Sequence, residues 1–340
     1  MNIYDISKKT GVSIATVSRV INNNAKVSEK TRRKVLDAIE ESGYTPNAFA
    51  RGLGLNTMKT IGIMCADASD PYLARAVYFI EQELRKNSYD SLLSCTGYDH
   101  SVKEKCLSML LSKRVDAVVL VGSNYVAEDN ERNSYIRTAA ATIPVMLVNG
   151  SLDAPNIYST VCDDRAAIRE VTNRFIASGR KKLLYLYNSC SFSGRNKLEG
   201  FRDAMKAAGL YSGEECERLI KPHVRSVHEM EQAVHEIAES GFEYDGVITS
   251  DDIIAAGVLK FAKHTGISVP DELFVAGYNN FDISECCEPE LTSVDNKLET
   301  ICRQCVATLM TVFSDEKTAP QKAVFSAEII ERESTGSVRA

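Results

Sequence analysis

The sequence predicts a small all-α N-terminal domain followed by an α/β core with two doubly wound parallel sheets. Up to residue 43, apolar side chains recur at helical spacing. From residue 60 onward, strand-length runs rich in Val, Leu and Ile alternate with helical segments. This alternation is typical of βαβ units, in which helices cover both faces of a parallel sheet. Residues 60–340 are too many for one open sheet, so we expect two similar lobes.

Charge is distributed unevenly along the 340 residues, of which 44% are hydrophobic. Residues 1–59 contain ten Lys and Arg against five Asp and Glu, which gives this part a net charge of +5. The rest contains 30 basic and 41 acidic residues, so its charge of −11 produces the overall value of −6. A basic head on an acidic body favours binding of nucleic acid by the head.

The sequence contains no membrane segment or secretion signal that we can recognise. No apolar run reaches the roughly 18 residues of a membrane helix. The first thirty residues carry Asp5, Lys8, Lys9 and Arg19 in place of a continuous apolar stretch. We therefore expect a cytoplasmic protein, in which the ten cysteines stay reduced.

The N-terminal domain is expected to hold three helices. Gly11 can adopt the left-handed conformation of a tight turn, and Ser13 and Ser28 can cap the helices that follow them. The apolar positions expected to pack are Ile6, Val12, Val17, Val20, Ile21, Val35, Leu36 and Ile39. Helix, turn and helix in this order allow the second helix to enter the major groove of DNA. A three-helix bundle with no role in DNA binding remains an alternative.

A family resemblance supports the DNA-binding interpretation. Gly11-Val12-Ser13, Ala15 to Val20, Asn22, Val27-Ser28 and Gly43 to Asn47 closely resemble the headpiece of the LacI/GalR family of bacterial repressors. Ser7 and Thr10 stand where alanine is usual. The resemblance implies a dimer, with a tetramer also open, that binds a pseudo-palindromic operator on double-stranded DNA. The implied DNA contacts are Tyr4, Ser13, Ile14, Ala15, Thr16, Ser18, Arg19, Asn22, Ser28, Asn47 and Leu53.

Specificity within the second helix depends on residues that vary in this family. The two that select the operator are Ile14 and Ala15 here, and neither side chain can form hydrogen bonds. They can offer only apolar contact, for example to a thymine methyl group. Our hypothesis is that Arg19, which suits guanine or phosphate, carries more of the specificity together with the hinge.

Residues 45–58 are interpreted as a hinge between the headpiece (residues 1–44) and the core (residues 59–340). The resemblance implies that Pro46 to Leu53 form a helix only when paired on the operator, with Leu53 wedged into the minor groove. Such a helix is marginal alone because it is short and because each glycine costs roughly 0.5–1 kcal/mol relative to alanine. A hydrophobic wedge kinks the duplex as it enters.

Core motifs also resemble the family over essentially the whole chain. They are Thr60 to Ile63, Asp70-Pro71-Tyr72, Gly200-Phe201, Thr249 to Asp252, Gly277 to Asn280 and Pro289 to Val294. The resemblance implies the bilobed fold of periplasmic sugar-binding proteins, with the chain crossing between lobes near 160, 288 and 322. Lobe 1 would then span about 59–160 and 289–321, and lobe 2 about 161–288 and 322–335.

A small polar effector, sugar or sugar derivative, is implied for the cleft between the lobes, beyond the carboxyl ends of the strands. The implied contacts are Asp70, Tyr72, Asn149, Ser193, Lys197, Asp251 and Asn279. Two departures bear on the ligand. Lys197 stands where arginine is usual and offers a point charge in place of a planar fork. Asn279-Asn280 stands where the family's Gly-Phe/Tyr-Asp-Asp motif has two aspartates, so an unusual sugar, a sugar phosphate or a protein co-regulator stays open.

Other functions and cofactors find little support in the sequence. Cys302 and Cys305 form a lone C-x-x-C in an amphipathic helix, which favours core packing over zinc, and Cys286-Cys287 lie in a predicted loop. No phosphate loop or catalytic constellation is visible, so we expect no enzyme, metal or cofactor. A periplasmic-type solute-binding protein is a second class, which the basic headpiece argues against, and an α/β enzyme is a third.

Overall fold

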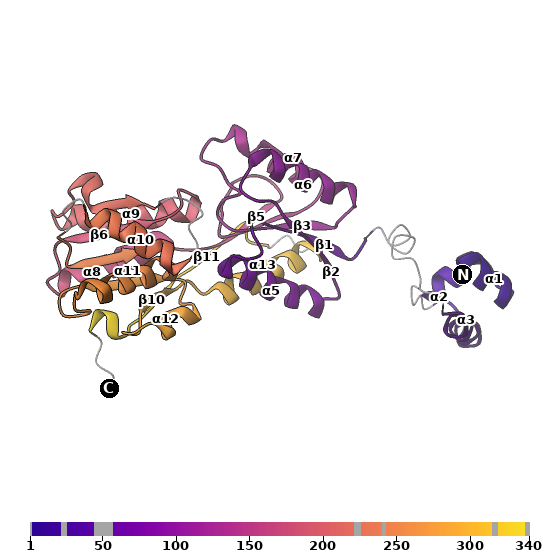
Figure 1. Cartoon of the computed structure of the whole chain (residues 1–340). Helices are drawn as coiled ribbons and strands as arrows, with labels where there is room; N and C mark the ends of the chain where they lie inside the picture. Colours follow the sequence, from indigo (N-terminus) through magenta and orange to yellow (C-terminus); the bar gives the residue numbers. More distant parts are fainter. Residues whose placement is uncertain are drawn as a thin grey trace.

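The computed structural model describes residues 2–21, 26–43, 57–220, 226–239, 243–314 and 319–336 (Figure 1). The N-terminal domain has three helices, as predicted: α1 (Ile3–Thr10), α2 (Ile14–Ile21) and α3 (Glu29–Ser42). Their core consists of Ile6, Val17, Val20 and Val35, all nearly inaccessible to solvent. Leu36, predicted to join this core, is instead 47% exposed, because one residue along a helix turns the side chain by about 100°.

The first lobe contains a six-stranded parallel sheet in the order β11-β5-β4-β3-β1-β2. In Figure 1, helices α5 and α13 cover one face of this sheet and α6 and α7 the other. The strands are β1 (Thr60–Cys65), β2 (Asp90–Cys95), β3 (Ala117–Val121), β4 (Val145–Val148), β5 (Ile157–Cys162) and β11 (Lys322–Phe325). The helices are α5 (Pro71–Lys86), α6 (His100–Ser112), α7 (Ser134–Ala140) and α13 (Leu298–Phe313).

The second lobe repeats this architecture with the order β12-β10-β9-β8-β6-β7, parallel except for the pairing of β12 with β10. Helices α8 and α9 pack on one face and α10 and α11 on the other. The strands are β6 (Leu183–Tyr187), β7 (Glu217–Leu219), β8 (Gly246–Thr249), β9 (Phe274–Tyr278), β10 (Thr292–Asp295) and β12 (Glu328–Ile330). The helices are α8 (Asp164–Ala177), α9 (Phe192–Ala207), α10 (Val227–Ala238), α11 (Asp252–Thr265) and α12 (Asp282–Cys286).

The chain crosses between the sheets three times: after β5, after β10 and after β11. The first crossing lies close to the predicted position near 160. The other two lie further along the chain than the predicted positions near 288 and 322. Strand β10 pairs with β9 and so belongs to the second lobe, whereas β11 pairs with β5 and belongs to the first. Short extended segments look alike on both sides of a crossing, and only their pairing partner assigns them to a sheet.

No helix in the described ranges is long and apolar enough to cross a membrane.

Helices α8 and α9 approach each other through Gly200. A Cβ atom at this position would lie 2.2 Å from the Arg165 carbonyl oxygen and 3.1 Å from the Arg169 amide nitrogen. Both neighbours are backbone atoms and cannot turn away as a side chain would. The glycine therefore sets the distance between the two helices.

We expect Gly200→Ala to destabilise the protein by about 1–3 kcal/mol, because relieving the overlap requires moving one helix backbone. Thermal and urea unfolding of the full chain would measure the change. Gly150→Ala is a matched control, since its Cβ would meet only ordinary contacts at 3.4 Å and beyond. Equal stability of the two variants would contradict the close approach.

Candidate functional site

The turn between α1 and α2 has the predicted geometry. Gly11 adopts the left-handed conformation, with φ of 67°, and its amide donates to the Ser7 carbonyl at 2.9 Å. Ser13 caps α2: its hydroxyl oxygen accepts from the Thr16 amide at 3.2 Å, and its carbonyl accepts from the Val17 amide at 2.9 Å. The cap fixes the direction in which α2 leaves the turn.

The outer surface of α2 carries the side chains that the sequence proposed for DNA contact. Val17 and Val20 face the core, which leaves Ile14 40% exposed and places Ala15 and Arg19 in solvent. Of the other predicted contacts, Tyr4, Ser13 and Ser28 are exposed and Thr16 and Ser18 half-buried. Asn22, Asn47 and Leu53 lie outside the described residues.

Two hydroxyl residues replace the usual alanines of this headpiece, and both are bonded to backbone. Ser7 donates to the Val12 carbonyl at 2.6 Å, and the buried Thr10 donates to the Ile6 carbonyl at 2.7 Å. Each substitution therefore adds a local hydrogen bond and leaves no buried hydroxyl unsatisfied. The helical scaffold accommodates both without changing the turn.

In the core, two of the predicted ligand residues begin helices that follow parallel strands. Asp70 caps α5 by accepting from the Leu73 amide at 3.0 Å, and Asp251 caps α11 by accepting from the Ile254 amide at 2.9 Å. Burial is the main cause that raises the pKa of both carboxyls, and the charge of Asp251 adds to the effect at Asp70. The two lobes thus bring one acidic helix cap each to a common region.

Lys197 is almost fully buried beneath this region. Its ammonium donates to the Ser250 carbonyl at 3.0 Å and lies 3.5 Å from the centre of the Tyr278 ring. Burial lowers the pKa of Lys197, and the carboxylates of Asp164 and Asp251 oppose that shift. Lys197 in α9 thus contacts the chain directly after β8 and the Tyr278 ring of β9.

Asp164, which the sequence analysis did not propose, is the acidic partner in this interior. The Tyr278 hydroxyl donates to one carboxylate oxygen, while the other oxygen has no hydrogen-bond partner in the structure. Its carboxylate is 1% exposed, and burial raises its pKa. The signal for it was an acidic residue directly after β5, where the chain crosses into the second lobe.

The two predicted asparagines occupy turns at strand ends. Asn149 follows β4 with φ of 62°, is 6% exposed, and its side-chain oxygen has no partner in the structure. Asn279 follows β9 with φ of 99°, and its side-chain oxygen accepts from Asn296 at 3.0 Å. Asparagine tolerates such left-handed backbone better than most residues, so both positions have a conformational role besides any contact with ligand.

Several buried polar atoms near the strand ends lack partners. The Tyr72 hydroxyl and the Ser193 hydroxyl belong to this group, although both were proposed as ligand contacts. The others are the side-chain atoms Asn124 Nδ2, Asn149 Oδ1, Asp164 Oδ2, Tyr185 Oη and Asn296 Oδ1. An unsatisfied buried polar group costs about 1–3 kcal/mol, so a polar ligand that bonds several of them gains affinity.

Direct contacts hold the two lobes together beside these residues. On one side, the Ser123 hydroxyl donates to the Ser191 hydroxyl at 2.8 Å, and the Phe192 amide donates to the Ser123 carbonyl at 3.2 Å. On the other side, Arg75 forms an ion pair with Asp282 at 3.4 Å. Sequence reasoning missed these four residues, although each pair includes a residue close to the end of a strand or to the start of a helix.

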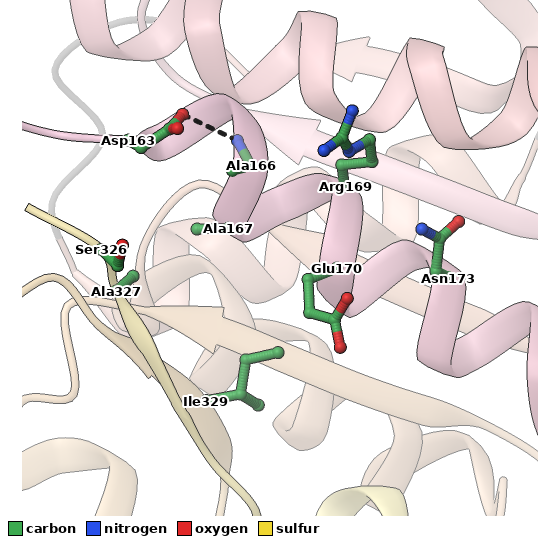
Figure 2. A pocket seen from close by; sticks show the side chains of 9 residues that line it. All are labelled: Asp163, Ala166, Ala167, Arg169, Glu170, Asn173, Ser326, Ala327 and Ile329. Carbon is green, nitrogen blue, oxygen red and sulfur yellow. Dashed lines mark hydrogen bonds between the residues drawn. The ribbon is translucent and has the colours of Figure 1, made fainter.

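Two cavities lie away from the predicted cleft. One, of about 510 Å³, is lined by residues of α8, which include Glu170 and Asn173, and by Ser326 and Ile329 after β11 (Figure 2). The other, of about 570 Å³, is lined in the second lobe by residues that include Lys181, Lys182 and Arg218. None of the seven predicted ligand residues lines either cavity.

Comparisons with known proteins agree with this architecture. Residues 2–47 match the family model described as bacterial regulatory proteins, lacI family, and residues 172–335 match the periplasmic binding protein-like domain. An HTH-type transcriptional regulator of Lachnoclostridium phytofermentans is 50% identical over 335 residues, covering 98% of this chain and 99% of that protein. GalR of Escherichia coli is 30% identical over 338 residues, covering 98% and 96%.

A solved structure shows the same fold. The Lac repressor dimer bound to operator and the anti-inducer ONPF superposes with a TM-score of 0.88 at 21% identity, covering 98% of this chain and 99% of that one. Headpiece and core together define a DNA-binding transcriptional regulator with a periplasmic-binding-protein-like core. The chain belongs to the lacI family of bacterial regulatory proteins.

Asp252 holds the loop of the second lobe that contacts the first. Its two carboxylate oxygens accept from the Ser293 hydroxyl at 2.5 Å and the Phe281 amide at 2.7 Å. A Cβ on Gly277 would lie 2.2 Å from the same carboxylate, so only glycine leaves room for it. Burial raises the pKa of Asp252 to about 7.

This pKa predicts a pH dependence of stability. Between about pH 4 and pH 7 the folded protein holds a proton on Asp252 that the unfolded chain has lost, so stability falls as pH rises through this window. Asp252→Asn should remove this loss of stability, which amounts to up to roughly 4 kcal/mol across the window. Urea unfolding at several pH values would test it, with exposed Asp90→Asn as control. An unchanged slope in Asp252→Asn would refute the assignment.

Proposed function

We propose that this regulator is a repressor that binds a pseudo-palindromic operator as a homodimer, with a sugar-like effector between the lobes controlling its affinity. The exposed surface of α2 is the observation that supports the DNA-binding part of this proposal. Its capped N-terminal end exposes Ile14, Ala15 and Arg19 over a buried apolar core. A helix in this setting can place its first residues against base edges in the major groove.

Dimerisation follows from the symmetry of such sites, because two headpieces read two half-sites related by a two-fold axis. The Lac repressor structure, which shares the fold, contains a dimer on its operator. The charge of +5 on residues 1–59, ahead of an acidic body, also suits this arrangement, since the core is repelled by the phosphates that attract the N-terminal part of the chain. Sedimentation of the free protein and of its operator complex would separate a dimer from a tetramer.

The effector half rests on the unsatisfied polar atoms at the strand ends. A polyol can donate to the carboxylates of Asp70 and Asp251 and bond to the hydroxyls of Tyr72 and Ser193. The CelR–cellobiose complex, which superposes with a TM-score of 0.71 at 24% identity and covers 98% of this chain, contains a sugar ligand. By linkage, an effector that changes operator affinity must have its own affinity changed by the same factor.

Charge favours a neutral sugar over a sugar phosphate. The described residues of the region include the carboxylates of Asp70, Asp164 and Asp251, while the buried ammonium of Lys197 is already engaged with Ser250 and Tyr278. A phosphate placed among these groups would meet more negative than positive charge. Hydroxyl groups meet no such penalty.

Gel-shift and binding-site selection with the full chain test the DNA-binding half. We expect a retarded, specific fragment at moderate salt, and a changed preferred site when Ile14 and Ala15 are replaced by polar residues, because those side chains would add hydrogen bonds to bases. Leu36→Ser, an exposed apolar-to-polar change on α3, serves as control and should keep the wild-type site. Selection of the same site by the Ile14/Ala15 variant would contradict base contact there.

A thermal-shift screen of neutral sugars and sugar phosphates tests the effector half. A hit should be neutral and should bind Asp251→Asn about tenfold or more weakly, because a charged acceptor is lost while the amide can still cap α11. Asp203→Asn, which removes a surface ion pair with Arg165 in the same lobe, should leave the affinity unchanged. Hits confined to sugar phosphates, or equal binding to both variants, would refute the proposed chemistry.

A further inference from the structure

Two cysteines lie side by side at the ends of β1 and β2. Cys65 and Cys95 are register partners in these parallel strands, and their sulfur atoms are 3.9 Å apart. The ladder continues past them, because the Thr96 amide donates to the Cys65 carbonyl at 2.9 Å and the Gly97 amide to the Ala66 carbonyl at 2.8 Å. Neighbouring strands lie about 4.8 Å apart, which is within the Cα separation of roughly 4.4–6.8 Å that a disulfide spans.

The two thiols differ in their access to solvent. Cys65 is completely buried against α5 and α13, whereas Cys95 is exposed on the edge strand β2. Burial, followed by the neighbouring Cys95, raises the pKa of Cys65 to about 12. Cys95 can therefore meet a dissolved oxidant first, while Cys65 is held in place to react with the product. Oxidation to a disulfide needs an accessible cysteine that reacts with the oxidant and a second cysteine, called the resolving cysteine, that attacks the oxidised sulfur.

We propose that Cys65 and Cys95 form a redox modification site that hydroperoxides convert to an intramolecular disulfide. The Cys95 thiolate attacks the peroxide oxygen, the O–O bond breaks, and the alcohol or water formed from the peroxide leaves after taking up a proton. The resulting sulfenic acid is attacked by the Cys65 sulfur, the S–S bond forms, and water leaves. Two thiols and one hydroperoxide thus give one disulfide, one alcohol or water molecule, and one water molecule.

Other cysteines in the described part of the chain lack this combination. Cys302 and Cys305 are both completely buried in α13, so an oxidant in solution has no access to them. Cys190 and Cys286 are exposed, but no sulfur contact like that of Cys65 with Cys95 is recorded for either among the described residues. We expect these exposed thiols to stop at sulfenic acid or an adduct.

The location gives the disulfide a consequence that rests on the proposed function. Strand β1 leads from Cys65 directly to Asp70, and the charge of Asp70 acts on Cys65 and on Tyr98, which follows Cys95. Joining the two strand ends would fix the loops that carry Asp70 and Tyr98. Oxidation would then change effector binding while leaving the headpiece helices untouched.

The test uses the full chain exposed to hydrogen peroxide, followed by blocking of free thiols, intact mass measurement and peptide mapping. We expect one disulfide linking the peptides of Cys65 and Cys95, reversed by dithiothreitol. Cys95→Ala should leave Cys65 reduced, and Cys65→Ala should leave Cys95 as a sulfenic acid that dimedone traps. Cys190→Ala, a matched exposed control, should form the disulfide at the wild-type rate.

A bridge between Cys95 residues of two copies, or oxidation of Cys95 in the wild-type chain without linkage to Cys65, would overturn the proposal. Intact mass measurement and peptide mapping are chemical readouts that do not depend on DNA or sugar binding. A failure of the proposed function would therefore leave their results unchanged. If Cys65→Ala does not fold, the Cys95→Ala result and the mapping of the wild-type chain still decide. The effector response of oxidised and reduced protein, measured with any sugar hit, tests the consequence separately.

Discussion

The parallel direction of the strands in both sheets is the constraint on which the ligand region depends. Parallel strands end at one edge, and the helix that follows each strand begins there, so side chains at these ends gather without being near in sequence. Asp70 after β1, Asn149 after β4, Asp251 after β8 and Asn279 after β9 all occupy such positions. Three crossings of the chain then bring the edges of two sheets together.

The charged groups buried beneath this edge have local partners, although one oxygen of Asp164 has none. Lys197 contacts a carbonyl and the Tyr278 ring, Asp164 accepts from the Tyr278 hydroxyl, and Asp252 accepts two hydrogen bonds. A single aromatic ring, Tyr278, thus joins the buried cation and the buried anion. Removing one member of such a set leaves its partner uncompensated, which destabilises the fold.

Much of the fold could be predicted because long, strongly periodic segments determine it. Apolar runs at 60–65, 117–121 and 183–187 predict strands, and the patterns at 72–86 and 297–313 predict helices. Strands β1, β3 and β6 and helices α5 and α13 lie within one residue of these bounds. Strands β5, β7, β10, β11 and β12 were missed, because each contains polar or charged residues and none is a continuous apolar run of strand length, so only pairing defines them. The same limit displaced the second and third crossings.

The ligand region was predictable to a lesser degree. Residues at strand ends within family motifs, such as Asp70 and Asp251, lie where the sequence placed them. Ser123 and Ser191 were missed because each is a common polar residue in an unmarked turn and its role depends on the opposite lobe, whereas the role of Asp164 depends on Tyr278, which is distant in sequence within the same lobe. Exposure was also misjudged at Leu36, because an apolar residue beside a core position is not distinguishable from a core residue by type alone.

Strand β1 offers a physical connection between the two functions of the chain. Its first residues are anchored by Asp116, whose carboxylate accepts from the Met58 and Thr60 amides at 3.0 Å, just after the segment that leads from the headpiece. Its last residue is Cys65, from which the chain runs to Asp70 at the effector region. A strand that is buried along nearly its whole length moves as a unit. If the proposed effector or the proposed disulfide with β2 displaces the Cys65 end of this strand, the displacement would reach the end that adjoins the DNA-binding domain.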